Sequence, residues 1–278
     1  MEETFIYAGG ARLAGKTQTR GGIFRLRPGD DHFEKLTNGM PEDNDVYTIT
    51  IHPQNPEVVF AGTRLGLYRS RDRGDHWQVL GLAGPSVEIW SLLVHPDNPQ
   101  LLYARASPVA VFRSDDNGDH WRRLPDPKIP NRVPIPFACR VMRLAADPHH
   151  PHELYAVLEV NGAMRSHDGG ESWEDCSAEL IRFANNPRYK NHLLTEVEIK
   201  GMLDGHALCV GAMEPVTVYL AVRMGLFRST DRGLTWSDME IGRFSPLTYG
   251  RDIRITPQDS QVMYACLSPA ARSETGAI

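Results

Sequence analysis

Charged, aromatic and histidine side chains recur at one place in successive segments of the chain, at the start of short β-forming runs. Carboxylates at such a place could bind a hard cation such as Ca²⁺, which prefers oxygen ligands, or supply the acid and base of a hydrolysis. A nearby histidine could act as a base. Aligned on the starts of the runs, the equivalent positions are Asp45, Glu88, Arg140, Asp204 and Tyr249; then Tyr47, Trp90, Met142, His206 and Arg251; and then Thr48, Ser91, Arg143, Ala207 and Asp252.

The elements that must position these residues are copies of one repeat. Segments 69–77, 113–121, 165–173 and 228–236 all follow the pattern Arg-Ser-x-Asp-x-Gly-x-x-Trp. A fifth copy, 25–33, keeps the arginine and has Phe33 in place of the tryptophan. The aspartate of such a turn can accept backbone N–H groups, and the glycine suits a backbone with positive φ. We expect the tryptophan to fill the apolar space between neighbouring sheets.

Each repeat also holds short β-rich runs separated by a proline turn and a loop. The unit is strand, proline turn, strand, loop, strand, glycine turn and strand, over about 44 residues from Ser70 to Ser114. Four antiparallel strands in a unit of this size are typical of a propeller blade. The sequence therefore predicts an all-β chain, a β-propeller of four-stranded antiparallel blades. A complete ring would have six or seven blades, of which this chain carries about five plus part of another.

The repeated motif resembles the Asp box, or bacterial neuraminidase repeat, of sialidases, xyloglucan hydrolases, sortilin-type receptors and photosystem II assembly factors. The resemblance covers nearly the whole chain and implies the propeller fold. It implies no single function, because those families do unrelated things on one scaffold. The sialidase residues do not carry over. The nearest match to their N-terminal Arg-Ile-Pro motif begins at Arg25, which aligns with the scaffold arginines of the other repeats.

We expect one domain over residues 1–278, beginning in the second strand of a blade (5–9) and ending after strands at 252–256 and 262–266. Residues 276–278 would start a third strand, so the chain could be a C-terminally incomplete fragment, or its two ends could complete one blade together. The longest segment between blades, 177–203, has a candidate helix cap at Ser177 and apolar residues at Leu180, Ile181 and Ala184. It would be either a helical lid over the channel or a packing element.

Composition narrows the function classes. The net charge of −5 provides no basic face for nucleic acid, and no apolar run is long enough to cross a membrane. The N-terminus lacks the pattern of a signal peptide, and the four cysteines form no disulfide framework or zinc spacing. We therefore expect a cytoplasmic protein that binds neither nucleic acid nor membranes.

The site is expected on the face that carries the connections between blades, 81–89, 125–140, 177–203 and 240–250, opposite the glycine turns, because insertions mark the functional side of a repeat protein. The predicted catalytic residues are Glu88, Asp204, His206 and Asp252. The predicted substrate-binding residues are Trp90, Arg143, Tyr249 and Arg251. The predicted calcium ligands are Asp45, Glu88, Asp204 and Asp252. In the alternative interpretation these carboxylates pair with Arg140, Arg143 and Arg251 around a water-filled hole.

Two functions follow from these residues. The favoured one is a hydrolase acting on a small polar substrate, a lactone, ester or glycoside, at the channel mouth, with calcium polarising the carbonyl. The alternative is a non-catalytic binding or assembly scaffold with a protein partner. Bound calcium or a deep pocket would favour the enzyme, and a shallow apolar rim would favour the partner surface.

Overall fold

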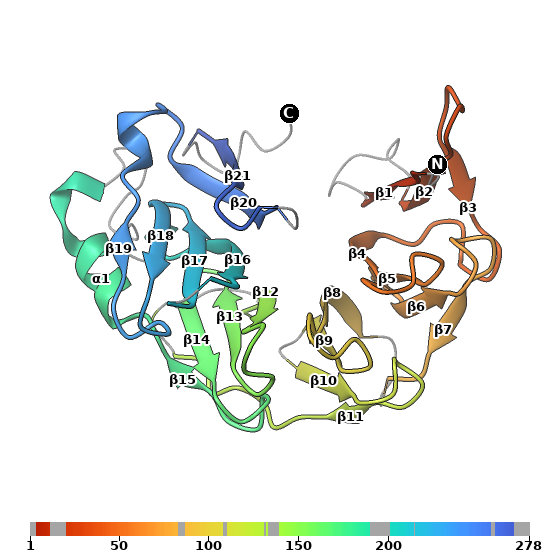
Figure 1. Ribbon diagram of the computed structural model, residues 1–278, viewed down its shortest axis with the longest axis horizontal. Coiled ribbons are helices and arrows are strands. Elements are labelled where there is room, and N and C mark those ends of the chain that lie inside the picture. Colours follow the sequence, from red (N-terminus) through yellow and green to blue (C-terminus); the bar gives the residue numbers. More distant parts are fainter. Residues whose placement is uncertain are drawn as a thin grey trace. The chain divides into compact units, whose positions relative to one another are not determined.

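The computed structural model describes residues 4–11, 21–82, 87–107, 110–130, 132, 139–189, 201–213, 215–256 and 259–269. The chain divides into two compact units, Met1–Leu124 and Pro125–Ile278, and each is described by itself (Figure 1). The expectation of a single domain over residues 1–278 stays a prediction. No helix among the described residues is both long and apolar enough to cross a membrane.

The first unit contains three consecutive antiparallel sheets, here called blades 1 to 3. Blade 1 has the strands β1 (Ile6–Gly10), β2 (Gly22–Leu26) and β3 (Glu34–Leu36). Blade 2 has β4 (Val46–Ile51), β5 (Val59–Thr63), β6 (Gly66–Ser70) and β7 (Gln78–Leu80). Blade 3 has β8 (Glu88–Val94), β9 (Leu102–Ser107), β10 (Ala110–Ser114) and β11 (Arg122–Arg123).

The second unit contains blades 4 to 6. Blade 4 has β12 (Val141–Ala146), β13 (Leu154–Leu158), β14 (Gly162–Ser166) and β15 (Glu174–Asp175). Blade 5 has β16 (Gly205–Gly211), β17 (Thr217–Val222), β18 (Gly225–Ser229) and β19 (Ser237–Asp238). Blade 6 has β20 (Tyr249–Ile255) and β21 (Met263–Ser268). The remaining elements are α1 (Ala178–Asn185), η1 (Pro187–Tyr189) and η2 (Ile241–Arg243).

The predicted order of four strands per repeat is confirmed in blades 2 to 5, because in each sheet every strand pairs with the next one along the chain. The expected first and last strands are also present, as β1 and as the β20–β21 pair. The strand expected at residues 276–278 lies outside the described residues. In blades 2 and 4 the second strand is covered on both faces, and β5 is buried along its whole length. That burial explains its continuous apolar run Val59-Phe60-Ala61.

The glycine turn of each repeat is held by two side chains. In blade 2 the Ser70 hydroxyl donates to Asp72 Oδ1 at 2.8 Å and accepts from the backbone N–H of Gly74 at 2.7 Å. Asp72 Oδ1 then accepts the N–H of His76 at 2.8 Å. The same bonds recur in blades 3, 4 and 5 around Asp116, Asp168 and Asp231.

These bonds stabilise the charged carboxylate. Burial alone would raise the pKa of Asp168, but the hydroxyl and N–H bonds from Ser172 outweigh it and lower that pKa to about 2. The bonds also hold two successive residues at positive φ, such as Asn117 at 59° and Gly118 at 87°. The predicted role of the aspartate and glycine is therefore confirmed.

The glycine turns of blades 2, 3 and 5 each pack on the blade before them. A Cβ built on Gly74 would lie 2.6 Å from Leu36 Cδ1 of blade 1, and one on Gly118 would lie 3.3 Å from Leu80 Cδ1 of blade 2. Trp77 is 5% exposed and shares an apolar cluster with residues of blades 1 and 2. The expectation that the tryptophan fills the space between sheets is confirmed here.

The repeat arginine makes a second contact between neighbouring blades. Arg25 of blade 1 is 2% exposed and donates to the carbonyl of Arg73 at 2.5 Å and to Asp75 Oδ1 at 2.6 Å, both in the turn of blade 2. Arg69 of blade 2 makes the same two bonds to the turn of blade 3, with Asn117 O at 2.8 Å and Asp119 Oδ1 at 2.7 Å. The turns of blades 2 and 3 are therefore each fixed by a glycine contact and by an arginine from the preceding blade.

Blade 4 departs from this rule in a consistent way. Its arginine, Arg165, bonds instead to Glu153 of its own blade at 2.8 and 2.9 Å. The next turn, in blade 5, has the exposed Leu234 where blades 2 and 3 have Asp75 and Asp119. The loss of the acidic residue in one blade thus coincides with an internal carboxylate partner in the blade before it.

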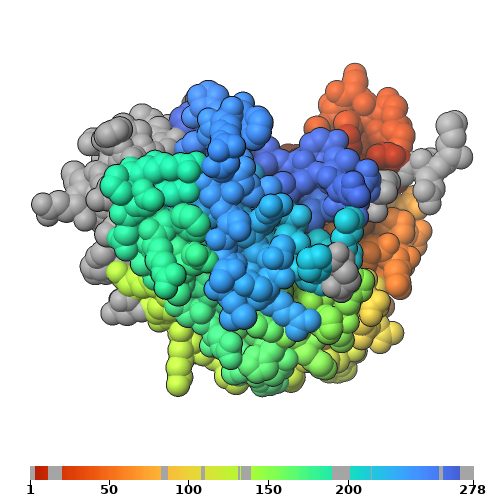
Figure 2. Space-filling model, turned by 60° about the vertical axis from the view of Figure 1, so that its left-hand side comes forward, coloured from red at the N-terminus to blue at the C-terminus, as the bar shows by residue number. Residues whose placement is uncertain are grey.

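The helix predicted in segment 177–203 forms, but it does not cover the start of the first strands. Leu180 and Ala184 are fully buried in the cluster that contains Trp236. The backbone N–H of Trp236 donates to Glu179 Oε2 of the helix at 2.8 Å. Figure 2 shows the helix surface lying directly against blade 5. The packing interpretation therefore holds for α1, and residues 190–200 of the segment lie outside the described residues. Ser177 precedes α1 without capping it, because its hydroxyl bonds to the backbone of Ala163.

The tryptophans should differ in their contributions to stability. Trp236 is 4% exposed and its indole N–H bonds to the Cys176 carbonyl at 2.8 Å, whereas Trp121 is only partly buried. We expect Trp236→Ala to lower the free energy of unfolding by about 3–5 kcal/mol, the usual cost of emptying a core aromatic site. Trp121→Ala should cost less. Equal losses in urea denaturation would contradict the assignment of Trp236 as the deeper wedge.

Candidate functional site

A β-bulge lies at the same place in the first strand of five blades. The register between the first and second strands shifts between Val46 and Thr48, and at the equivalent point in blades 3 to 6. A bulge adds one residue to the strand and re-aims its side chain. The extra residues are Tyr47, Trp90, Met142, His206 and Arg251. They are the second set of equivalent positions found in the sequence.

The residues just before the bulges also correspond. The carbonyls of Asp45, Arg140 and Asp204 each accept an N–H from the connection between the second and third strands. The donors are Arg64, Glu159 and Arg223, at 2.9, 2.7 and 3.0 Å. In blade 2 the side chains pair as well, with Arg64 Nε 3.3 Å from Asp45 Oδ2. In blade 4 the signs are exchanged, with Arg140 Nη1 3.5 Å from Glu159 Oε1.

In the first unit, the bulges of blades 2 and 3 bring two aromatic rings together. Tyr47 and Trp90 stack with ring centroids 4.0 Å apart and planes 6° apart. The indole N–H of Trp90 donates to Glu88 Oε2 at 3.1 Å. Glu88 and Trp90 are thus neighbours, and Glu88 orients the indole. A flat, half-buried aromatic pair of this kind provides a stacking surface.

In the second unit, four predicted site residues meet at the start of β16 and β20. The Tyr249 hydroxyl donates to Asp204 Oδ2 at 2.5 Å. His206 Nε2 lies 2.6 Å from the same hydroxyl oxygen and 3.0 Å from Arg251 Nη1. The other carboxylate oxygen of Asp204, Oδ1, is buried and has no hydrogen-bond partner among the described residues.

Burial and the surrounding charges set the protonation of this cluster. Burial lowers the pKa of His206, and Arg251 and Arg223 lower it further, although Asp204 opposes them. Burial raises the pKa of Tyr249, and the Asp204 carboxylate adds to that effect. At neutral pH the histidine is therefore uncharged and the tyrosine keeps its proton. Two guanidinium groups lie over the Tyr249 ring, Arg251 at 3.8 Å and Arg223 at 5.4 Å from its centroid.

The remaining predicted residues of this unit form a second ion pair. Asp252 Oδ1 lies 3.5 Å from Arg143 Nη2, and its Oδ2 lies 3.1 Å from Arg254 Nε. Burial lowers the pKa of Arg143, and the nearby Arg254 lowers it further. The two groups together hold four arginines, Arg143, Arg223, Arg251 and Arg254, against Asp204 and Asp252. The local balance is positive in a chain whose net charge is −5.

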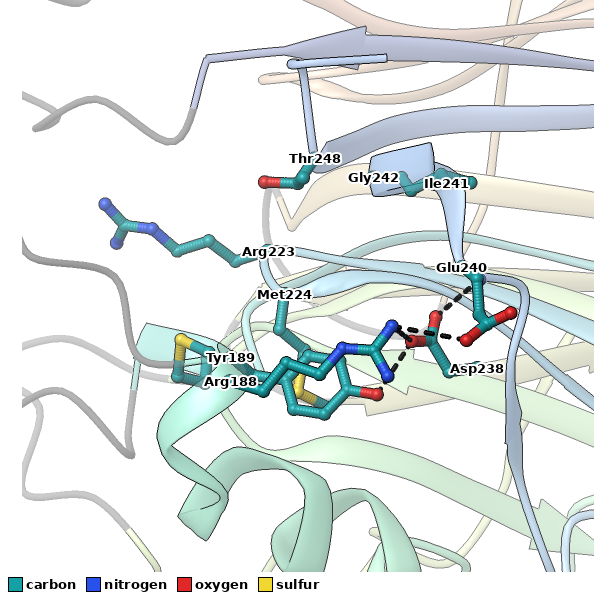
Figure 3. A pocket seen from close by; sticks show the side chains of 10 residues that line it. Arg188, Tyr189, Arg223, Met224, Asp238, Glu240, Ile241, Gly242 and Thr248 are labelled. Carbon is teal, nitrogen blue, oxygen red and sulfur yellow. Dashed lines mark hydrogen bonds and ion pairs between the residues drawn. The ribbon is translucent and has the colours of Figure 1, made fainter. Parts of the chain in front are cut away.

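A cavity of about 250 Å³ opens beside this cluster (Figure 3). Met202, Met224 and Ile241 give it an apolar part. On another side, Arg188 is held by Asp238 at 3.5 Å and Glu240 at 3.4 Å. Arg223 lines the cavity and extends away from that ion-pair network. The same arginine therefore belongs to the cavity and to the Tyr249 cluster.

The predicted calcium ligands are divided between the two units. Asp45 and Glu88 belong to the first unit, and Asp204 and Asp252 to the second. Asp252 pairs with Arg143, one of the arginines that the alternative interpretation names, whereas Asp45 pairs with Arg64 and Asp204 bonds to Tyr249. Within the described ranges, no three His, Cys, Asp or Glu side chains are placed to hold a metal ion. Calcium binding stays a prediction.

The sequence did not single out Arg223 or Arg254, nor the cavity residues Tyr189 and Met202. Arg223 lies in a hairpin connection one strand away from the aligned positions, and its partner Tyr249 comes from the next blade. Arg64, Glu159 and Arg223 do share a sequence signal, because each follows the second strand of its blade by one residue. Their proximity to the first strands depends on the hairpin register.

Comparisons with known proteins support the fold and no finer assignment. No protein-family profile and no curated protein sequence matches the chain. Among solved structures, an ancestral GH74 enzyme matches with a TM-score of 0.63 and 12% identity, covering 86% of this chain and 31% of its own. YCF48 bound to D1 peptide matches with a TM-score of 0.58 and 13% identity, covering 94% and 71%. The GH74 enzyme of Niastella koreensis matches with a TM-score of 0.60 and 13% identity, covering 96% and 42%.

The chain thus spans less than half the length of the two GH74 enzymes and about two thirds of YCF48. Together with the four-stranded antiparallel sheets, these likenesses show that the chain has the β-propeller fold.

The lowered pKa of His206 predicts a pH-dependent contribution to stability. The unfolded chain takes up a proton on this histidine near its ordinary pKa, ~6.5, whereas the folded chain resists protonation. The contribution should therefore be complete above that value and lost as the pH falls towards the folded pKa. The difference in unfolding free energy between the parent and His206→Gln should be larger at pH 7.5 than at pH 5. Met142→Gln, at an equivalent bulge without a titrating group, should change the unfolding free energy by the same amount at pH 7.5 and pH 5. The same result for His206→Gln would contradict a lowered pKa of His206 in the folded chain.

Proposed function

We propose that this propeller recognises a small anionic ligand at the start of β16 and β20, with the ligand's charge between Arg251 and Arg223 and its apolar part in the adjacent cavity. One observation carries the proposal. Four arginines lie close to only two aspartates in this part of an acidic chain. One of them, Arg251, is the bulge residue of β20 and lies over the Tyr249 ring. An excess of guanidinium groups in a partly buried cleft attracts carboxylate and phosphate groups.

The cavity specifies the ligand further. Its apolar wall contains Met202, which is 1% exposed, and Met224, which is 7% exposed. Methionine side chains adapt their shape to aliphatic groups. The two carboxylates in the wall, Asp238 and Glu240, are paired with the two arginines Arg188 and Arg243, so this wall adds no net negative charge against an anion. The expected ligand is therefore an acid with a short aliphatic or aromatic body.

We further infer that the Ser-x-Asp-x-Gly turns are Asp boxes, because their serine, aspartate and glycine make the same bonds in four blades. They serve the scaffold rather than the ligand. The proposed site lies at the opposite end of the blades, since the glycine turn joins the third and fourth strands and the bulge begins the first. The solved neighbours do not choose between functions, because a GH74 enzyme and a peptide-bound YCF48 share the fold equally well.

Hydrolysis is a second candidate, and His206 favours it. A buried histidine that stays neutral can take a proton from water, and the nearby guanidinium groups of Arg251 and Arg223 could stabilise the oxyanion formed from an ester or lactone carbonyl. A glycosidase is less well supported, because it needs two carboxylates about 5–10 Å apart. Of the two predicted catalytic aspartates of this unit, one bonds to Tyr249 and the other to Arg143. Calcium-assisted hydrolysis depends on calcium binding, which stays a prediction.

The binding proposal predicts a charge-selective response. Hexanoate should raise the melting temperature of the protein by mass action, whereas hexanamide, of similar size and without charge, should not. Arg251→Gln should weaken hexanoate binding about ten-fold or more, because a charge-assisted contact is lost. Arg182→Gln, which removes an exposed arginine of α1 in the same unit, is the matched control and should bind as the parent does. Equal shifts of the melting temperature with hexanoate and hexanamide would contradict the proposal that the ligand is an anion.

The hydrolase candidate is tested with 4-nitrophenyl esters and aliphatic lactones. Any activity should fall on acidification through the lowered pKa of His206, because a protonated imidazole is no base. His206→Gln should then reduce kcat by roughly 10²–10⁴-fold while leaving hexanoate binding detectable. If the parent has no activity towards these substrates, the hydrolase candidate is rejected in favour of the binding proposal. If His206→Gln retains the parent's activity, His206 is not the catalytic base.

A further inference from the structure

A groove between blades 5 and 6 occupies the position at which other pairs of blades hold a glycine turn. Its volume is about 360 Å³, and its walls include Met213, Tyr219, Arg228, Met239, Ile255 and Met263. It lies at the end of the blades opposite the proposed anion site. The filled copies in blades 1, 2 and 4 show which chemical groups such a groove accepts.

The first correspondence is the residue under the turn glycine. In the filled copies this residue is Leu36, Leu80 or Cys176, and a Cβ built on the glycine above it would lie 2.6, 3.3 or 3.2 Å away. Met239 is the equivalent residue of blade 5, since its N–H bonds to Leu226 O as that of Cys176 bonds to Ala163 O. Met239 lines the groove. The groove therefore has an apolar seat for a glycine.

The second correspondence is the repeat arginine. Arg25 and Arg69 are 2% and 4% exposed because each reaches a carbonyl and an aspartate in the next turn. Arg228, the same residue of blade 5, is exposed and has no hydrogen bond or ion pair within the described ranges. It also lacks the internal carboxylate that satisfies Arg165, because the position of Glu153 is occupied by Thr217.

The third correspondence is the strand beside the groove. Among the described strands, β21 pairs only with β20. The equivalent strands β5 and β13 are buried along their whole length, whereas Tyr264 of β21 is 67% exposed. An unpaired strand edge with exposed apolar side chains is a template for an added strand.

We propose that this groove binds a strand–turn–strand segment of the repeat type, supplied by a protein partner. The first strand of the segment adds to the free edge of β21. Its turn glycine lies on Met239, the acidic residue after the glycine bonds to Arg228, and its tryptophan fills the groove between blades 5 and 6. The partner is thus recognised by a Ser-x-Asp-x-Gly-Asp-x-Trp pattern, the chemistry of the segments that fill the equivalent sites in blades 1 and 2.

The test uses the turn of blade 3 as a probe. A fluorescent peptide with the sequence of residues 110–124, which contains the turn with Asp119 and Trp121, is titrated with the full chain and its anisotropy is measured. We expect saturable binding. Arg228→Gln should weaken it ten-fold or more, and so should replacing Trp121 by alanine in the peptide. Arg243→Gln, an equally exposed arginine of the same unit, is the control and should bind as the parent does.

A second measurement covers weak binding by the free peptide, which must become ordered when it binds. The same segment is joined to the C-terminus of the full chain through a flexible Gly/Ser linker, which raises its effective concentration to the millimolar range. The fusion should melt several degrees above the same fusion with Trp121→Ala in the added segment, and Arg228→Gln should abolish the difference. The proposal is overturned if neither the peptide nor the fusion pair responds, if binding is insensitive to Arg228→Gln, or if the chain instead dimerises through this groove.

Discussion

The contact between a turn glycine and an apolar residue of the preceding blade, present in blades 2, 3 and 5, constrains much of the structure. The glycine and the residue before it both need positive φ, and the serine and aspartate supply the hydrogen bonds that hold this backbone. A Cβ would lie 2.6 Å from Leu36 Cδ1 at Gly74 and 3.3 Å from Leu80 Cδ1 at Gly118, so a larger residue would have to displace these side chains. Local conformation and packing between blades are therefore satisfied by the same residue, and neighbouring blades are held at the distance that the contact allows.

The repeat arginine shows how the constraint tolerates change. A buried guanidinium needs an acceptor, so the arginine of one blade and the acidic residue of the next turn act as a pair. Where Leu234 replaces the acidic residue, Glu153 has appeared beside Arg165. Arg228 has neither partner in the described structure. The ligand proposed for the groove between blades 5 and 6, which Arg228 lines, therefore follows from the contacts seen in the other blades and does not depend on the anion site.

Separation of scaffold and site along each blade leaves the site free to vary. The turns that fix the blades lie at one end, and the bulges lie at the other. A bulge residue is re-aimed whatever its type, which is why Tyr47, Trp90, Met142, His206 and Arg251 can occupy one structural position with different chemistry. In the first unit the outcome is an aromatic stack, and in the second a histidine and arginine beside a tyrosine–aspartate pair. The site's charge balance, unlike the fold, is therefore particular to this chain.

The sequence by itself determined the four-stranded repeat, the bonding role of its serine, aspartate and glycine, and the alignment of the bulge positions. These features are local, because they depend on residues within one blade and recur at a fixed spacing. Only the tertiary structure decided that Asp204 bonds to Tyr249, that Arg223 flanks the same ring, and that α1 packs on Trp236. Those contacts join different blades, and their geometry follows from strand register and side-chain packing, which the spacing of residues along the chain does not encode.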